Sequence, residues 1–271
     1  MALITLTSDI GQQDYLVGAL KGQLLQINPA FSLIDISHTL SPFNYPQAAY
    51  VCRNAINNFP PYTFHLLMVN LFEKKPEQLL LAYHQEQYIL CADNGLLTMI
   101  LEGKPEMVIG LPLDKTANKN TLYCARVMGQ AVQALQGGTS LMEIGTPDVR
   151  FIETNHLRPL LSDNWIEGQI IFIDNFENIV VNITHTQFEE QRKGRSFQIV
   201  FKRNEVISAI SETYADVPEG EKLALFNAAG YLEIAINKGN AAGLFGLQGF
   251  TEKSQNMQNR LFYQTVRIHF E

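Results

Sequence analysis

The sequence contains few cysteines and no long apolar run. Its three cysteines, Cys52, Cys91 and Cys124, are too few and too scattered for a disulfide framework, and none belongs to a CxxC pair. No stretch of about 18 apolar residues is present, and no signal-type segment precedes the first apolar run. We therefore expect a cytoplasmic protein that does not associate with membranes and has no structural zinc.

Positive charge is also scarce. The chain has 20 Lys and Arg against 27 Asp and Glu, a net charge of −7, so it offers no positive field to a phosphate backbone. The densest basic run, Arg192, Lys193 and Arg195, is expected to be solvated. The histidines are dispersed, and no Walker A, HExxH or G-x-S-x-G pattern occurs. We expect no nucleic-acid partner and no metal site.

Apolar residues are abundant, at 46% of the chain against 17% charged residues, which is enough for a large packed core. In the first half, short β-rich runs alternate with runs that have apolar residues at helical spacing. The strands are expected at residues 2–9, 31–40 and 63–70, and the helices at residues 14–28 and 48–59. This rhythm predicts an α/β N-terminal domain with a mostly parallel sheet and flanking helices.

The pattern changes after Gly137 and Gly138. From Trp165 onward the sequence predicts a series of strands with little helix, which favours a largely antiparallel β-barrel or sandwich. The expected strands lie at residues 168–174, 178–183, 196–201, 222–227, 231–236 and 263–270. We therefore predict an N-terminal domain at residues 1–153, a linker at residues 154–164 and a C-terminal β domain at residues 165–271.

Polar side chains stand where several predicted strands end. Asp9 ends the first strand just before Gly11, where open α/β sheets place ligand-binding loops; it is either a ligand-binding carboxylate or a turn residue. Asp174 and Asn178 stand between two apolar runs, where they either bind a ligand or satisfy backbone groups of a tight turn. The run from Asp93 to Gly95 has the composition of a tight turn between a strand and a helix.

Three of these segments together resemble the S-adenosyl-L-methionine (SAM) hydroxide adenosyltransferase family and its relatives, fluorinase and chlorinase. They read TLTSDIGQQDYLVGALKG at residues 5–22, CADNGLLT at residues 91–98 and IIFIDNFENIVVNI at residues 170–183. The resemblance covers nearly the whole chain. It implies the same two domains, SAM as substrate without a further cofactor, and a homotrimer whose pockets lie between the N-terminal domain of one subunit and the C-terminal domain of its neighbour.

The resemblance also assigns ligand contacts in the N-terminal half. Asp9 would accept hydrogen bonds from the ribose diol, as suits a bidentate carboxylate. Asp14 would contact the methionine amine, or else stabilise the start of a helix. Phe43 would lie beside the ribose, or else anchor its loop in the core. Asn94 and Cys124 stand at further pocket positions of the family.

In the C-terminal half, the resemblance places adenine contacts. Asn178 offers a carboxamide that matches a purine edge, with Asp174 and Phe176 preceding it in the family's Asp-x-Phe-Gly-Asn pattern. Here Glu177 replaces the glycine of that pattern. Tyr214 would stack on adenine, although its hydroxyl also suits a structural role. His38, in a segment resembling the family's Asp-x-x-His, is expected to support its loop.

The chain departs from the family where the attacking water is bound. The hydrolases use an Asp, an Arg and a His; Asn70 stands at the position of the Asp, Glu77 at that of the Arg if no gap is needed, and Tyr123 at that of the His. Halide chemistry is disfavoured, because an ionised Glu73 would repel a halide. The methionine carboxylate also loses its side-chain donor, because Ala228 and Ala229 occupy the family's serine-bearing turn.

Two functions remain open. In the first, the protein is a divergent enzyme that displaces L-methionine from SAM at the ribose 5′-carbon, with water as the nucleophile and adenosine as the product. The candidate catalytic residues are then Asn70, Glu73, Glu77 and Tyr123, with Glu73 or Glu77 as base unless both are solvated loop acids. In the second, it is a catalytically degenerate protein that binds adenosine or SAM.

Overall fold

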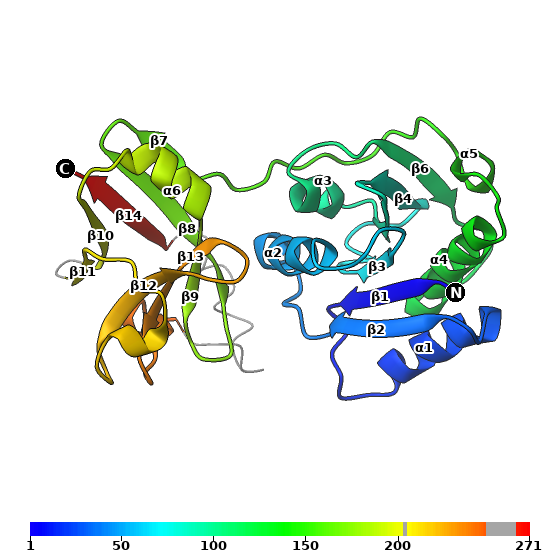
Figure 1. The fold of residues 1–271 in the computed structure, drawn as a ribbon. Coiled ribbons are helices and arrows are strands. Elements are labelled where there is room, and N and C mark those ends of the chain that lie inside the picture. The colour runs from blue at the N-terminus through cyan, green and yellow to red at the C-terminus, as the bar shows by residue number, and fades with distance from the viewer. Residues whose placement is uncertain (203–204, 248–263) are drawn as a thin grey trace. The chain divides into compact units, whose positions relative to one another are not determined.

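The computed structural model describes residues 1–202, 205–247 and 264–271. Contacts divide the chain into two compact units, Met1–His156 (unit 1) and Leu157–Glu271 (unit 2), and Figure 1 shows the elements of each. In the part of the chain that the structure describes, no helix has the length and apolarity needed to cross a membrane. The same residues contain no group of three or more His, Cys, Asp or Glu side chains placed to hold a metal ion.

Unit 1 contains a six-stranded sheet with the order β2-β1-β3-β5-β4-β6 (Figure 1). Its strands are β1 (Leu3–Ser8), β2 (Ser32–Ser37), β3 (Phe64–Met68), β4 (Gln78–His84), β5 (Gln87–Ala92) and β6 (Met107–Pro112). The pairs β1/β2, β1/β3 and β3/β5 are parallel, which confirms the predicted α/β domain. The pairs β4/β5 and β4/β6 are antiparallel, so the sheet is mixed.

The antiparallel edge results from a tight hairpin that the sequence analysis did not identify. Only Gln85 and Glu86 separate β4 from β5, and their φ values of 47° and 59° are those of a type I′ turn. Glycine and asparagine usually occupy such positions, so the glutamine–glutamate pair gave no turn signal.

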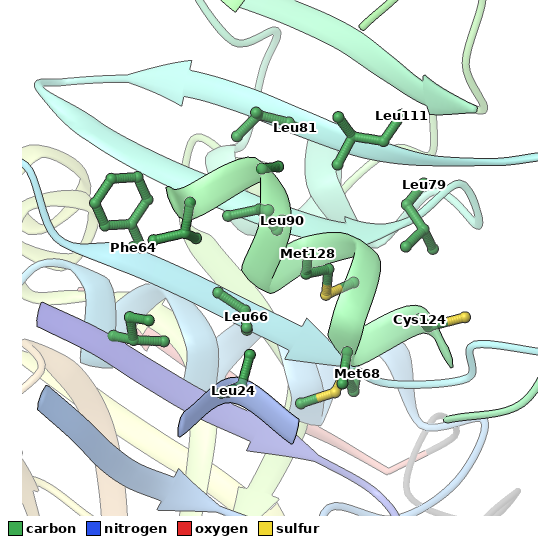
Figure 2. Packing of buried hydrophobic residues seen from close by; sticks show 14 of the residues in the cluster. Leu24, Phe64, Leu66, Met68, Leu79, Leu81, Leu90, Leu111, Cys124 and Met128 are labelled. Carbon is green, nitrogen blue, oxygen red and sulfur yellow. The ribbon is translucent and has the colours of Figure 1, made fainter. Parts of the chain in front are cut away.

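Helices cover both faces of this sheet. They are α1 (Leu16–Ile27), α2 (Tyr45–Ile56), α3 (Leu96–Leu101), α4 (Thr121–Gln136) and the short α5 (Leu141–Ile144). Alternate residues of β3 point to opposite faces: Leu66 packs with α1 and α4, whereas Leu67 packs with α2 and α3. Figure 2 shows the first of these cores, with Met128 of α4 among the leucines of the sheet. The layers are therefore helix, sheet and helix.

Unit 2 contains an eight-stranded, fully antiparallel sheet that is nearly barrel-shaped, as the C-terminal half of the sequence predicts. Its strands are β7 (Leu160–Ser162), β8 (Trp165–Ile173), β9 (Ile179–Thr184), β10 (Phe197–Lys202), β11 (Glu205–Ile207), β12 (Lys222–Phe226), β13 (Tyr231–Ile236) and β14 (Thr265–Phe270). Short helices α6 (His185–Arg192), η1 (Tyr214–Asp216) and α7 (Ala241–Leu244) join them. The Ser211 N–H donates to the carbonyl of Ala224 over 2.8 Å, which brings the chain after β11 beside β12.

The two arginines of the basic run at the end of α6 are structural, not merely solvated. The guanidinium of Arg192 lies over the rings of Phe188 and Phe197, at 5.9 and 5.1 Å from their centroids. Arg195 lies over Phe270 at 5.2 Å and donates to the backbone carbonyls of Asp163 and Gln191. Cation–π contacts and charge-assisted hydrogen bonds therefore hold both arginines against the rest of unit 2.

Candidate functional site

A pocket of about 240 Å³ lies in unit 1 at the carboxyl ends of β1 and β3. It is lined by residues from four segments: Asp9, Ile10, Pro42, Phe43, Met68, Asn70, Leu71, Phe72, Glu73 and Thr121. Strand β1 lies between β2 and β3, and the loops that leave β1 and β2 enter α1 and α2, which pack on opposite faces of the sheet. These two loops therefore diverge beside β1 and leave a crevice, which is where open α/β sheets bind ligands.

Asp9 and Asn70 connect the two strand ends. The Asn70 backbone N–H donates to Oδ2 of Asp9 over 2.9 Å, and Oδ1 of Asn70 accepts from the backbone N–H of Phe43 over 3.0 Å. Asn70 and Phe43 both have left-handed backbones, with φ values of 48° and 62°. Asparagine tolerates this conformation better than most residues. Three loops that are far apart in sequence are thereby joined around the pocket.

The electrostatics of the pocket are set by its carboxylates. Burial raises the pKa of Asp9 above its usual value, opposed by the hydrogen bond from the Asn70 N–H. Glu73 accepts a hydrogen bond from the hydroxyl of Tyr45. Burial and this hydrogen bond to Glu73 both raise the pKa of Tyr45, so Tyr45 stays a neutral donor at physiological pH. Among the residues that the structure describes, no lysine or arginine lines the pocket, whose described lining therefore suits a neutral or cationic ligand better than an anion.

A buried hydrogen-bonded chain lies behind Asp9. Ser8 Oγ and His38 Nδ1 are 2.7 Å apart, and His38 Nε2 lies 3.1 Å from Oδ1 of Asp35, which also pairs with Lys21. Ser8 and His38 are both fully buried, so this Ser-His-Asp arrangement is closed to a substrate. The carbonyl of His38 accepts from the N–H of Gly11, so His38 supports the turn that carries Asp9, as its sequence predicts.

Asn94 lies outside the pocket lining and hydrogen-bonds to the loop that carries Asn70. Its Oδ1 accepts from the N–H of Leu96 over 3.2 Å, and its Nδ2 donates to the carbonyls of Val69 and Asn70 over 3.0 and 3.3 Å. The predicted tight turn is confirmed: Gly95 has a φ of 89°, and a Cβ there would lie 2.1 Å from Oγ1 of Thr154. Asn94 thus positions the Asn70 backbone and is not itself part of the lining.

The structure separates the other predicted unit 1 residues from the lining. Asp14 accepts from the N–H of Leu16 over 2.8 Å at the start of α1, as in its helix-start interpretation. Glu77 is exposed beyond the pocket. The Tyr123 hydroxyl accepts from the Asp114 N–H over 2.9 Å. Cys124 is fully buried in the core of Figure 2, where burial raises the pKa of its thiol to about 11.

In unit 2, Asp174 and Asn178 form a tight turn between β8 and β9. Asp174 Oδ1 accepts from the backbone N–H groups of Phe176 and Asn178, and its Oδ2 accepts from Nδ2 of Asn178 over 3.0 Å. Phe176 is 75% exposed at the tip of this turn. The turn interpretation of Asp174 is therefore confirmed, and a ligand role for the turn stays a prediction.

Tyr214 has a partner that the sequence analysis did not single out. Its hydroxyl donates to Oε1 of Glu233 over 2.6 Å. Glu233 is only 4% exposed, and burial raises its pKa, with Asp174 nearby adding to the effect. Both Glu233 and Tyr45 could have been suspected from the sequence: Glu233 interrupts an apolar strand, and Tyr45 follows Phe43 in a turn-rich loop.

Comparison with known proteins gives the family. Residues 4–145 match the SAM hydroxide adenosyltransferase N-terminal domain, and residues 168–252 match the C-terminal domain. The chain belongs to this family. The likeness that the sequence showed at three segments therefore extends over both units.

Named relatives of this family cover most of the chain. It is 26% identical over 258 residues to an (R)-S-adenosyl-L-methionine hydrolase of Methanocaldococcus jannaschii, covering 92% of this chain and 94% of the relative. A fluorinase of Nocardia brasiliensis is 23% identical, covering 91% and 94%. A structure of an uncharacterised protein from Thermotoga maritima has the same fold, with a TM-score of 0.80 at 23% identity, covering 99% of this chain and 100% of that one.

Proposed function

We propose that this chain hydrolyses SAM by displacing L-methionine from the ribose 5′-carbon with water, giving adenosine. The observation that carries the proposal is the unit 1 pocket, where Asp9, Asn70 and Glu73 line one crevice at the carboxyl ends of β1 and β3. Membership of the family and relatives named as (R)-S-adenosyl-L-methionine hydrolases support SAM as the substrate. Asp9 would hold the ribose diol.

The chemistry needs few groups. A water oxygen bonds to the 5′-carbon while the carbon–sulfur bond breaks, and the electron pair of that bond passes to sulfur to give the neutral thioether of methionine. The sulfonium leaves readily, so the protein has to desolvate and align the water and accept its proton. Of the two candidate bases, Glu73 lines the pocket and Glu77 does not, which favours Glu73. The negative pocket disfavours halide as the nucleophile.

A second candidate is binding of adenosine or SAM without turnover. The hydrolases bind the attacking water with three side chains, and at two of these positions this chain has Glu77 and Tyr123, which do not line the pocket. The Tyr123 hydroxyl also accepts a hydrogen bond from the Asp114 backbone N–H. An enzyme that has lost these groups would be slow, by about 10²- to 10⁴-fold relative to a family member that keeps the Asp, Arg and His.

One assay separates the two candidates. Purified protein is incubated with each sulfonium epimer of SAM, and adenosine and methionine are measured by chromatography, beside a calorimetric titration with adenosine. Equimolar formation of both products supports hydrolysis, whereas adenosine binding without products supports the binding protein. Glu73→Gln should lower the rate by at least about tenfold and Glu77→Gln should change it less; the opposite ranking would assign the base to Glu77.

A further inference from the structure

Glu233 is a buried acid in the middle of an apolar strand of unit 2. It lies in β13 and is paired with Leu225 of β12 and Val180 of β9. Because its neighbours Leu232 and Ile234 pack in the main core of unit 2, the Glu233 side chain points to the other face of the strand. Burying a carboxylate costs free energy that an apolar residue would not cost. Packing of the strand therefore does not explain an acid at this position.

Three segments that are far apart in sequence meet at this side chain. The Tyr214 hydroxyl of η1 donates to Oε1 of Glu233 over 2.6 Å. The Asn227 side chain also hydrogen-bonds to Glu233, and because its Oδ1 accepts from two N–H groups of its own turn, its Nδ2 is the donor. Burial raises the pKa of Glu233, and the charge of Asp174 in the turn after β8 adds to this effect. Glu233 therefore connects η1 with the turns after β12 and β8.

The backbone around η1 is held without Glu233. Asp216 accepts at Oδ2 from the N–H of Thr213 over 3.0 Å and at Oδ1 from the Thr213 hydroxyl over 2.8 Å. Val217 packs on a small apolar cluster of β12 and β13. The contact with Glu233 adds something different, because it fixes the far end of the Tyr214 ring.

The Tyr214 ring is a surface on which a flat ligand could stack. The side chain is 43% exposed and its hydroxyl is engaged by Glu233, so the ring and not the hydroxyl is offered to a ligand. Stacking on an aromatic face needs no hydrogen bond from the ligand. A ring held at both ends loses little further freedom when a ligand binds, which favours binding.

We propose that Glu233 is a positioning residue, which holds the Tyr214 hydroxyl and thereby presents the ring face on which a flat aromatic ligand stacks. The ligand is the adenine ring of the proposed substrate, so this inference rests on the proposed function. Glu233 acts through Tyr214 and does not itself touch the reacting atoms. An acid in β13 is thus explained by binding and not by packing.

Calorimetry of adenosine binding to the full-length protein tests this role without turnover. Tyr214→Phe removes the hydroxyl and keeps the ring, and Glu233→Leu removes the acceptor. Each should weaken binding by about three- to tenfold, as expected when one side chain is no longer held in its bound orientation. Since both changes break the same hydrogen bond, the double variant should lose no more affinity than either single variant. Glu233→Gln keeps a carbonyl oxygen for the hydroxyl and should recover most of the affinity lost in Glu233→Leu.

Tyr62→Phe is the matched control. The Tyr62 hydroxyl donates to Oε1 of Glu86 over 3.2 Å in unit 1, outside the pocket lining, and its loss should leave adenosine affinity unchanged. Urea unfolding of each variant is measured alongside. A loss of stability without a loss of affinity in Glu233→Leu would make Glu233 a purely structural residue and overturn the proposal.

Three other results also contradict the positioning role. They are parent-like binding by Tyr214→Phe, additive losses in the double variant, and a Glu233→Gln variant as weak as Glu233→Leu. Failure of the parent to bind adenosine overturns the role as well, whatever the assay with SAM gives. Adenosine binding without products from SAM overturns the proposed hydrolysis and leaves the role of Glu233 to be decided by the variants.

Discussion

The ionised side chain of Asp9 lowers the stability of the folded protein, and the same charge makes it a better acceptor for a ligand. Burial raises its pKa, so keeping it ionised at neutral pH costs free energy in the folded protein. The same ionised carboxylate is the stronger acceptor for a pair of ribose hydroxyls. A group with these properties is expected where function, not folding, has determined the residue.

We expect Asp9→Asn to weaken adenosine binding by about 1.5–3 kcal/mol, roughly 10- to 150-fold, because a charged acceptor is lost. Its free energy of unfolding at pH 7 should not fall, since the amide oxygen can still accept from the Asn70 N–H and no buried charge remains. Calorimetry and urea unfolding measure the two quantities. A variant that binds like the parent would show that the diol does not meet Asp9.

His65 is a buried histidine with a purely structural environment. Its Nδ1 lies 2.7 Å from Thr5 Oγ1, and its Nε2 contacts Oε1 of Gln87, whose Nε2 is committed to the Ile56 carbonyl. Gln87 therefore presents an acceptor, so His65 carries its proton on Nε2 and accepts from Thr5. Burial lowers the pKa of His65 to about 4.

This pKa predicts acid sensitivity. As the pH falls from about 6.5 to 4, the unfolded chain takes up a proton at His65 and the folded chain does not. The free energy of unfolding should therefore fall as the pH is lowered through that range. The loss attributable to His65 should approach about 3 kcal/mol. In His65→Gln, which does not titrate, this part of the pH slope should disappear even if the variant is less stable overall. Parallel slopes in urea unfolding would contradict the assignment.

At the scale of elements, the end of α3 shows how a helix next to the site is terminated. Glu102 caps the helix in a left-handed conformation. Arg53 of α2 donates from Nε to the Ile100 carbonyl and from Nη2 to the Met99 carbonyl, each over 2.6 Å, and also pairs with Glu102. One side chain therefore satisfies the carbonyls that every helix leaves unpaired at its C-terminus.

We expect Arg53→Met to lower the free energy of unfolding by about 1.5–3 kcal/mol, because charge-assisted hydrogen bonds to part-buried carbonyls are lost. Arg126→Met is the matched control on α4, where the guanidinium lies 5.6 Å from the Tyr123 ring and is exposed. Its loss should stay below about 1 kcal/mol. Equal losses in urea unfolding would show that the carbonyl contacts contribute little.

At the scale of the whole molecule, the predicted ligand contacts are divided between two units with separate cores. Asp9, Phe43, Asn70 and Glu73 belong to unit 1, whereas Asp174, Asn178 and Tyr214 belong to unit 2. The family resemblance expects both sets to serve one nucleoside in a homotrimer. Both expectations stay predictions, and each has a direct measurement.

For the shared ligand, we expect the double variant Asp9→Asn with Tyr214→Ala to lose adenosine affinity by the sum of the single losses. Tyr214→Ala alone should cost about 1–3 kcal/mol, by analogy with bases stacked on aromatic rings. Calorimetry would contradict the prediction if either single variant bound like the parent.

For the homotrimer, light scattering should give a mass three times that of the 30.5 kDa chain, and a mass of one chain would exclude the trimer.

The sequence by itself determined the element types, because apolar periodicity and turn residues act locally. It predicted the alternating first half, the strands of the second half, the turn at Gly95 and the supporting role of His38. Local patterns could not predict the hairpin between β4 and β5, where Gln85 and Glu86 adopt left-handed conformations that their residue types do not favour. They also gave no sign that Arg192 lies on the ring of Phe197 or that Arg195 lies on the ring of Phe270, which belongs to a strand distant in sequence.

Only the tertiary structure decided which candidates share a site. Asn70, Glu73, Glu77 and Tyr123 were all candidate catalytic residues from the sequence, yet of these four only Asn70 and Glu73 line the pocket. That selection follows from the order of the strands, because placing β1 between β2 and β3 brings the loops at residues 9, 43 and 70 together. Long-range pairing sets such proximity, whereas spacing along the chain does not encode it.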